Sequence, residues 1–383
     1  MKFLTKKVFS LGTIIWLHVS FSVALIMAWT IIKRGWDFSV TSFPNERFYM
    51  AGGPDVFNLA AVVIGAMFRY LHFNHLTFYL FNVFVSAATV VVFFHLARTC
   101  LDRKLALYVT AIFAFNPELA FYNNFVLKEN ALILIIVVAM YLFFKALAAD
   151  WSGYKVLFCL LLPLIALIRE PLILMGFLPL ALLPKTTRRL IFFCGIAAAC
   201  GLLYLMREQA GALIRSYWLS HTGNYGATKA IVEDIYGVPT AVTFGEVFSS
   251  PALFAEYFLR SFLYYVRPGW NAGVKFNSFL VPYTLFVVYV FAASFPYRKY
   301  LASAYRTAYF FIGMAIILAS LIIIIYDPVE RYRYSVYQLG FTLLILNLKG
   351  YQEYHSPEVY DNSPAASDCG MHKDLGAVIN KSQ

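Results

Sequence analysis

Residues 76–97 read LTFYLFNVFVSAATVVVFFHLA, a run that contains no Asp, Glu, Lys or Arg. A run of this length crosses the ~30 Å hydrocarbon core of a bilayer when it forms an α-helix. Because lipid offers no hydrogen bonds to the backbone, a spanning segment must satisfy its own amide groups, as a helix does. The stretch therefore predicts an all-α membrane protein.

Basic residues follow this run and recur in every second connection along the chain, beginning with Arg98, Arg103 and Lys104. Further spans are predicted at about 8–32, 105–121, 130–147, 154–168, 171–184, 190–206, 277–296, 307–326 and 335–348. Short loops rich in Lys and Arg stay in the cytoplasm. The pattern thus predicts a polytopic helical bundle of about ten spans with both termini cytoplasmic.

The composition agrees with a chain that consists mainly of membrane helices. Of 383 residues, 61% are hydrophobic and only 13% are charged, and the mean hydropathy is +0.68. We expect one transmembrane domain over residues 1–349, with a long outer loop at about 207–276, and a polar, disordered cytoplasmic tail over 350–383. The net charge of +11 is attributed to topology, so no nucleic-acid partner is expected.

The first outer connection, about 33–75, contains a short apolar stretch at 56–71. We interpret this stretch as an interfacial or re-entrant helix beside the membrane. The alternative is a true span, which would move every later basic connection to the outer side. The charge pattern opposes that alternative.

Charged residues gather in four places on the predicted outer face: at 45–49, 128–129, 169–170 and 327–333. Ionisable groups at membrane depth are costly and commonly functional. A carboxylate can deprotonate a hydroxyl within hydrogen-bond reach, and arginines bind phosphate through paired hydrogen bonds. Together these groups suit transfer of a group from a lipid phosphate carrier.

The order of short motifs along the chain supports this interpretation. Glu46 is followed by Tyr49 and Ala51; Pro117, Asn123 and Glu129 introduce the fourth span; Arg169 lies in a short outer turn; and an aromatic and basic stretch, 330–334, precedes the last span. This layout resembles the GT-C class of membrane glycosyltransferases, which use polyprenyl-phosphate sugars and include the protein mannosyltransferases and aminoarabinose transferases.

The resemblance implies an enzyme that acts on a bacterial surface glycan, in the inner (cell) membrane. It implies Glu46 as the catalytic base, with Asp55 as the second candidate. The substrate and carrier-phosphate site would consist of Arg169, Arg331, Arg333, Glu129, Tyr49 and Lys128. The implied partners are a polyprenyl-phosphate-linked sugar donor, a glycan acceptor and the lipid bilayer. The resemblance leaves open a divalent cation, Mg²⁺ or Mn²⁺, as cofactor. The family usually has Asp where this chain has Glu46, and Asp37 is another possible equivalent.

Each of these residues also has a purely structural interpretation. Glu46 can pair with Arg47, Arg169 can pair with Glu170, and Asp55 can cap the helix that follows it. The arginines before the last span can extend to lipid phosphates. Two other functions also remain open. One is an O-antigen-type polysaccharide polymerase; the other is a flippase or transporter of lipid-linked glycans, for which charges near the bilayer midplane and inverted repeats would be typical.

Overall fold

The computed structural model describes residues 10–34, 37, 50, 59–148, 152–168, 170–191, 194, 273–326 and 330–355. These residues form helices joined by turns and short connections, and the described part contains no strand, so the prediction of an all-α fold is confirmed there. Four described helices are long and apolar enough to cross a membrane: Leu11–Ile31, His75–Arg98, Glu129–Ala148 and Ser303–Ser320. A bent pair, Arg103–Ala114 with Pro117–Asn124, makes a fifth if it counts as one span.

The described elements, in chain order, lie close to the predicted spans. They are α1 (Leu11–Arg34), α3 (Leu59–Tyr70), α4 (His75–Arg98), α5 (Arg103–Ala114), α6 (Pro117–Phe121), η1 (Tyr122–Asn124), α7 (Glu129–Ala148), α8 (Ser152–Ile168), η2 (Glu170–Leu182), α13 (Gly273–Ser294), η4 (Phe295–Tyr300), α14 (Ser303–Tyr326) and α15 (Glu330–His355). The predicted span at 190–206 and the long loop at 207–276 fall almost entirely outside the described residues.

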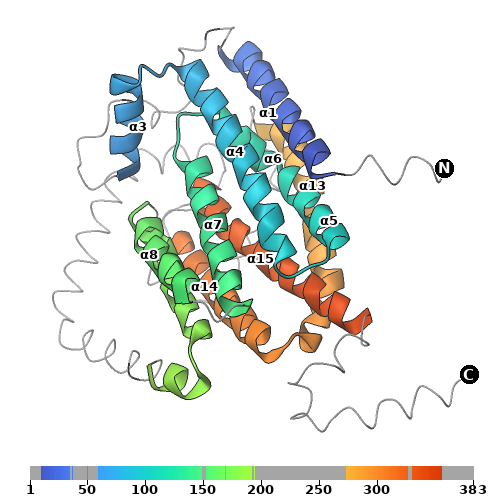
Figure 1. Cartoon of the computed structure of the whole chain (residues 1–383). Coiled ribbons are helices and arrows are strands. Elements are labelled where there is room, and N and C mark those ends of the chain that lie inside the picture. The colour runs from blue at the N-terminus through green and yellow to red at the C-terminus, as the bar shows by residue number, and fades with distance from the viewer. Residues whose placement is uncertain are drawn as a thin grey trace, which may run out of the picture.

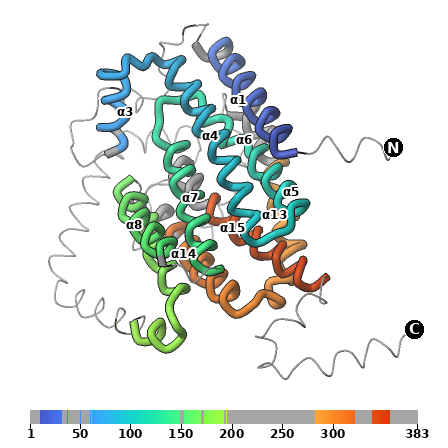
Figure 2. The backbone as a smooth tube through the Cα atoms, in the orientation of Figure 1, coloured from blue at the N-terminus to red at the C-terminus, as the bar shows by residue number. Residues whose placement is uncertain are grey.

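Helix α4 lies between α7 on one side and α1 and α5 on the other (Figure 1), and it packs against all three. Helix α7 continues the packing to α8, while α14 packs along η2 and α15 (Figure 2). Where α4, α5 and α15 meet, the rings of Phe93 and Phe113 stack with centroids 4.0 Å apart, and the ring of Phe341 contacts both edge-on. Such close van der Waals packing is the main attraction between helices in lipid.

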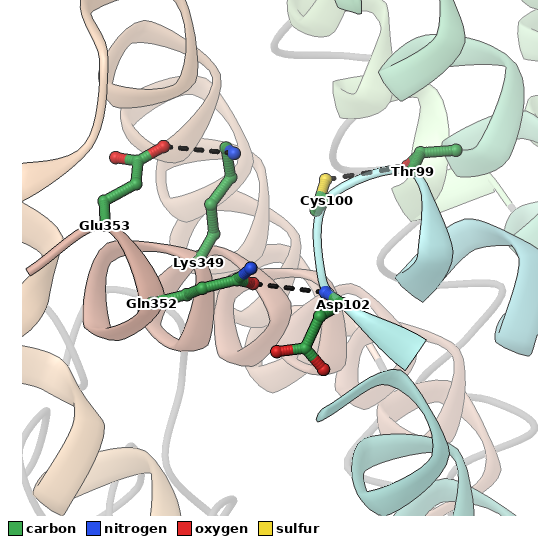
Figure 3. Close-up of polar contacts among 6 residues, drawn as sticks. All are labelled: Thr99, Cys100, Asp102, Lys349, Gln352 and Glu353. Atoms are coloured by element: carbon green, nitrogen blue, oxygen red, sulfur yellow. Dashed lines mark hydrogen bonds and ion pairs between the residues drawn. The ribbon is translucent and has the colours of Figure 1, made fainter. Parts of the chain in front are cut away.

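One end of the bundle joins the α4–α5 turn to the last helix (Figure 3). The backbone N–H of Asp102 donates to Oε1 of Gln352 at 3.1 Å, across 250 positions of sequence. One turn away, Lys349 and Glu353 form an ion pair of 3.0 Å within α15. The C-terminus of α4, the N-terminus of α5 and the C-terminus of α15 therefore lie together.

The rings of Tyr297 and Tyr351 meet edge-on with centroids 5.0 Å apart, which places η4, just before α14, beside the end of α15. Two further contacts then bring other connections to the same end. Nη1 of Arg188 donates to Oγ1 of Thr307 at 3.1 Å, which joins the segment after η2 to the start of α14. The rings of Phe144 and Tyr305 stack with centroids 6.5 Å apart, which joins the end of α7 to α14. We call this end the basic end, because its connections carry Arg98, Arg103, Lys104, Lys145, Lys155, Lys185, Arg188, Arg189, Arg298, Lys299, Arg306 and Lys349. This gathering agrees with the predicted alternation of basic connections.

The structure departs from the predicted elements in three places. The predicted span 105–121 is not one helix, because the chain bends by 51° between α5 and α6. Asn116 caps α6 by accepting from Glu118 N at 3.0 Å, and Pro117 at the first position lacks an N–H, so this sequence starts a new helix. The predicted span 171–184 is a 3₁₀-helix of 13 residues, which at about 2 Å per residue reaches about 26 Å.

The third departure concerns a helix limit, because α15 continues to His355, past the predicted domain boundary at 349. Within the apolar stretch 56–71 the described helix is α3, with 12 residues. Its length of about 18 Å, at 1.5 Å per residue, is too short for the hydrocarbon core and agrees with the predicted short helix. The rest of the predicted tail, 356–383, lies outside the described residues.

Candidate functional site

Helix α5 ends inside the bundle, and the chain that follows it is buried. With 12 residues, α5 rises about 18 Å. Residues 116–127, which we call the inner segment, pass through α6 and η1 and are buried except for the half-buried Phe121. The inner segment packs against α1, α4, α7 and α13. Irregular backbone is tolerated at membrane depth when protein encloses it, and such breaks commonly form sites.

Side chains from other helices bind the carbonyl groups that this break frees. Nδ1 of His18 contacts the oxygen of Ala114 at 2.8 Å. The hydroxyl of Tyr283 donates to the oxygen of Ile112 at 2.7 Å. Because a free carbonyl in a low-dielectric interior costs free energy, these polar residues stabilise the end of α5.

A hydrogen-bonded chain of four buried side chains crosses the same region; we call His18, Ser86, Asn123 and Asn130 the polar chain. Nδ2 of Asn130 donates to Oδ1 of Asn123 at 2.6 Å, and Nδ2 of Asn123 donates to Oγ of Ser86 at 3.2 Å. Oγ of Ser86 lies 3.0 Å from Nε2 of His18. The polar chain therefore connects α7, η1, α4 and α1.

Part of the direction of the polar chain follows from its acceptors. A carbonyl oxygen only accepts, so Nδ1 of His18 carries a proton toward Ala114. The two amide bonds, from Asn130 to Asn123 and from Asn123 to Ser86, both point toward Ser86. The hydroxyl of Ser86 donates to the Val83 oxygen at 3.0 Å, and the roles in its contact with Nε2 of His18 depend on the tautomer of the ring.

Two acidic residues and a lysine lie at the edges of the inner segment. Glu118 is 5% exposed and Glu129 is 2% exposed. Asn82 of α4 donates to the oxygen of Phe125 at 2.8 Å and fixes the path between them. Nζ of Lys128 donates to the oxygen of Ile168 at 2.6 Å, as cations commonly do at a helix C-terminus. The start of α7 therefore lies beside the connection from α8 to η2.

The described positions of the predicted site lie away from the basic end. Helix α7 reaches the basic end with its C-terminus, so Lys128 and Glu129 lie toward the other end. Helix α15 also ends at the basic end, so Arg331 and Arg333 in its first turn lie away from it. The side chains of these two arginines are outside the described residues, as are Glu46, Tyr49, Asp55 and Arg169. Asp37 is exposed.

The polar chain was not among the residues that sequence reasoning selected, apart from Asn123. The sequence does contain a pattern that could have indicated Ser86. Asn82 and Ser86 are polar residues four positions apart within an apolar run, so they share one face of a helix. His18 lies alone among apolar residues, and no spacing connects it to Ser86. Within the described ranges, no group of three or more His, Cys, Asp or Glu side chains could hold a metal ion.

In comparisons with known proteins, no family model matches the chain, and no curated protein matches it.

Proposed function

We propose that the chain is an integral membrane glycosyltransferase of about ten spans, in a bacterial inner membrane, with both termini in the cytoplasm. It moves a sugar from a polyprenyl-phosphate carrier to a lipid-linked or surface glycan on the outer side. The observation that carries the proposal is the bond from Lys128 Nζ to the Ile168 oxygen, 2.6 Å. It brings Lys128 to the end of α8, 40 positions away in sequence, and Arg169 is the next residue along the chain.

In this proposal Glu46, or Asp55 in its stead, accepts the proton of the acceptor hydroxyl. The hydroxyl oxygen then attacks the anomeric carbon of the carrier-linked sugar. The bond from that carbon to the phosphate oxygen breaks, and polyprenyl phosphate leaves. Arg169, Arg331 and Arg333 hold the phosphate and stabilise its charge. Glu129 positions the acceptor or a divalent cation, and Lys128 and Tyr49 also contribute to binding the substrate or the carrier phosphate.

The test compares three variants that each change one carboxylate to an amide. Glu46→Gln and Glu129→Gln should abolish sugar transfer, while Glu353→Gln, at the basic end, should retain it. Cells that lack the gene are complemented with each variant, and the surface glycan and the amount of protein in the membrane are both measured. An unchanged glycan in Glu46→Gln cells would remove Glu46 from the catalytic role. Shortened glycan chains, with no single sugar lost, would indicate a polymerase instead.

A flippase or transporter of lipid-linked glycans is the second candidate, because the polar chain lies within the bundle and polar groups inside spanning helices commonly mark a substrate path. Proteoliposomes that contain the purified protein distinguish the two functions. Release of free polyprenyl phosphate from the sugar donor supports transfer. Movement of an intact lipid-linked glycan across the bilayer, without that release, supports transport.

A further inference from the structure

A cavity of about 480 Å³ lies at the basic end, where η4 turns into α14. Its lining consists of Pro296, Arg298, Lys299, Leu301, Arg306, Tyr309 and Phe310. The inner segment contributes no residue to it, and the proposed sugar transfer does not use it. Its volume is in the range of sites that bind small molecules.

The cavity presents three cations, two of which rest on aromatic rings. The guanidinium carbon of Arg298 lies 3.6 Å from the ring centroid of Phe295. Nη1 of Arg298 also donates to the backbone oxygen of Phe295 at 3.1 Å. Nζ of Lys299 lies 4.9 Å from the ring centroid of Tyr300. Arg306 is exposed on the first turn of α14. Ring contacts orient a cation but leave its charge, and no ion pair among the described residues neutralises any of the three. An anion is therefore favoured.

The other lining residues are apolar and favour a ligand that has an apolar part as well as a negative charge. Leu301 is 2% exposed and forms an apolar floor. Phe310 is 61% exposed, and Ile317, two turns further along α14, is 56% exposed on the same face. The cavity thus opens onto apolar surface of a helix long enough to cross a membrane. An occupant that matches both parts has a negative head and an apolar tail.

The cations are the polar groups that the cavity offers to a ligand. Tyr309 is also a lining residue, but its hydroxyl is buried beside the amide of Asn347 and contributes no contact in this proposal. We propose that the cavity binds the phosphate headgroup of an anionic phospholipid from the leaflet at the basic end. Arg298, Lys299 and Arg306 contact the phosphate, while Leu301 and Phe310 contact the glycerol and acyl chains.

The experiment titrates the purified full-length protein in detergent with three probes: dioctanoyl phosphatidylglycerol, dioctanoyl phosphatidylcholine and inorganic phosphate. Bound lipid is counted by native mass spectrometry, and the midpoint of thermal unfolding is followed in parallel. Phosphatidylglycerol should bind and raise the midpoint, whereas the other two probes should not. Arg306→Gln should weaken binding about fivefold, and Arg298→Gln/Arg306→Gln should weaken it further, because each basic residue near an anionic lipid contributes about 1 kcal/mol. Arg306 is exposed, so its single variant should fold even if the double variant does not.

The matched control, Arg103→Gln/Lys104→Gln, removes two charges from the same end but outside the cavity, and it should bind phosphatidylglycerol as the unchanged protein does. Equal weakening in the control would reduce the effect to the general charge of the basic end and overturn the proposal. Stabilisation by inorganic phosphate alone would identify a simple anion site, and equal binding of phosphatidylcholine would show that the cations select nothing. Either result also overturns it.

Discussion

At the scale of single residues, the clearest prediction concerns two buried serines with different surroundings. Ser86 connects His18 to Asn123, whereas the hydroxyl of Ser22, buried on α1, forms no hydrogen bond within the described residues. Ser86→Ala leaves two polar groups without a partner and should lower the free energy of unfolding by roughly 1–3 kcal/mol. Ser22→Ala should change it little. Reversible unfolding in mixed micelles measures both, and equal effects would show that the polar chain adds no stability.

A second residue-scale prediction concerns pH. Burial raises the pKa of the Cys100 thiol from 9.0 to about 11; the nearby Glu353 charge acts in the same direction, while the Thr99 hydrogen bond and the Lys349 charge oppose it. Between pH 9 and 11 the native thiol therefore keeps a proton that the unfolded chain loses. The stabilisation is complete below pH 9 and is lost as the pH rises through this window.

The loss amounts to roughly 2–3 kcal/mol, at about 1.4 kcal/mol per pKa unit. Unfolding free energies of the unchanged protein and of Cys100→Ala, measured at pH 8, 9, 10 and 11, check this expectation. The Cys100→Ala variant should lose less stability across the window. Parallel curves for the two proteins would mean that the thiol does not control the alkaline loss.

The residue scale is also where prediction from sequence was least complete. Lys128 and Glu129 could be selected because charges at the edge of an apolar run are unusual. The environment of His18 could not be, because its partners Ser86 and Ala114 lie 68 and 96 positions away. A buried histidine that satisfies a carbonyl has no local pattern. It becomes visible only when the break after α5 has been placed in three dimensions.

At the scale of elements, α15 contains two glycines that differ in one respect. A Cβ on Gly350 would overlap the backbone carbonyl of Tyr297 and lie 2.8 Å from its carbon, whereas a Cβ on Gly340 meets nothing within 4 Å. Gly350→Ala should therefore push η4 away from α15 and destabilise the protein by about 1–3 kcal/mol. Gly340→Ala should stabilise it by about 0.5–1 kcal/mol, because alanine favours the helix. Thermal midpoints of the two variants should move in opposite directions; a decrease in both would contradict the close contact as the cause.

Most described elements follow from composition, and the exceptions have local causes. The lengths of the apolar runs predicted the limits of α4 and α7 to within one or two residues. It could not place the bend after α5, because apolar character continues through it and the turn depends on the Asn116 cap and Pro117. It also could not distinguish the 3₁₀ form of η2 from an α-helix, since both forms accept the same apolar residues.

At the scale of the whole molecule, the presence of basic residues in every second connection predicted more of the topology than any single motif did. It implied that every second connection lies on one side, and the contacts from Asp102 to Gln352 and from Arg188 to Thr307 agree with that implication. Through the positive-inside rule, the same pattern also predicts that the basic end faces the cytoplasm.

Two engineered cysteines at opposite ends test this orientation. Leu71, just before α4, is 64% exposed, and Lys104, at the start of α5, is exposed at the basic end. With the native cysteines replaced by alanine, Leu71→Cys should react with a membrane-impermeant maleimide in intact cells. Lys104→Cys should react only after the membrane is permeabilised. Leu71 and Lys104 lie at opposite ends of α4, so the opposite labelling result would show that the bundle is inverted. The Lys128–Glu129 pair would then lie on the cytoplasmic side and could not take part in chemistry on an external glycan. Labelling of both from outside would show that α4 does not cross, and its assignment as a span would be wrong.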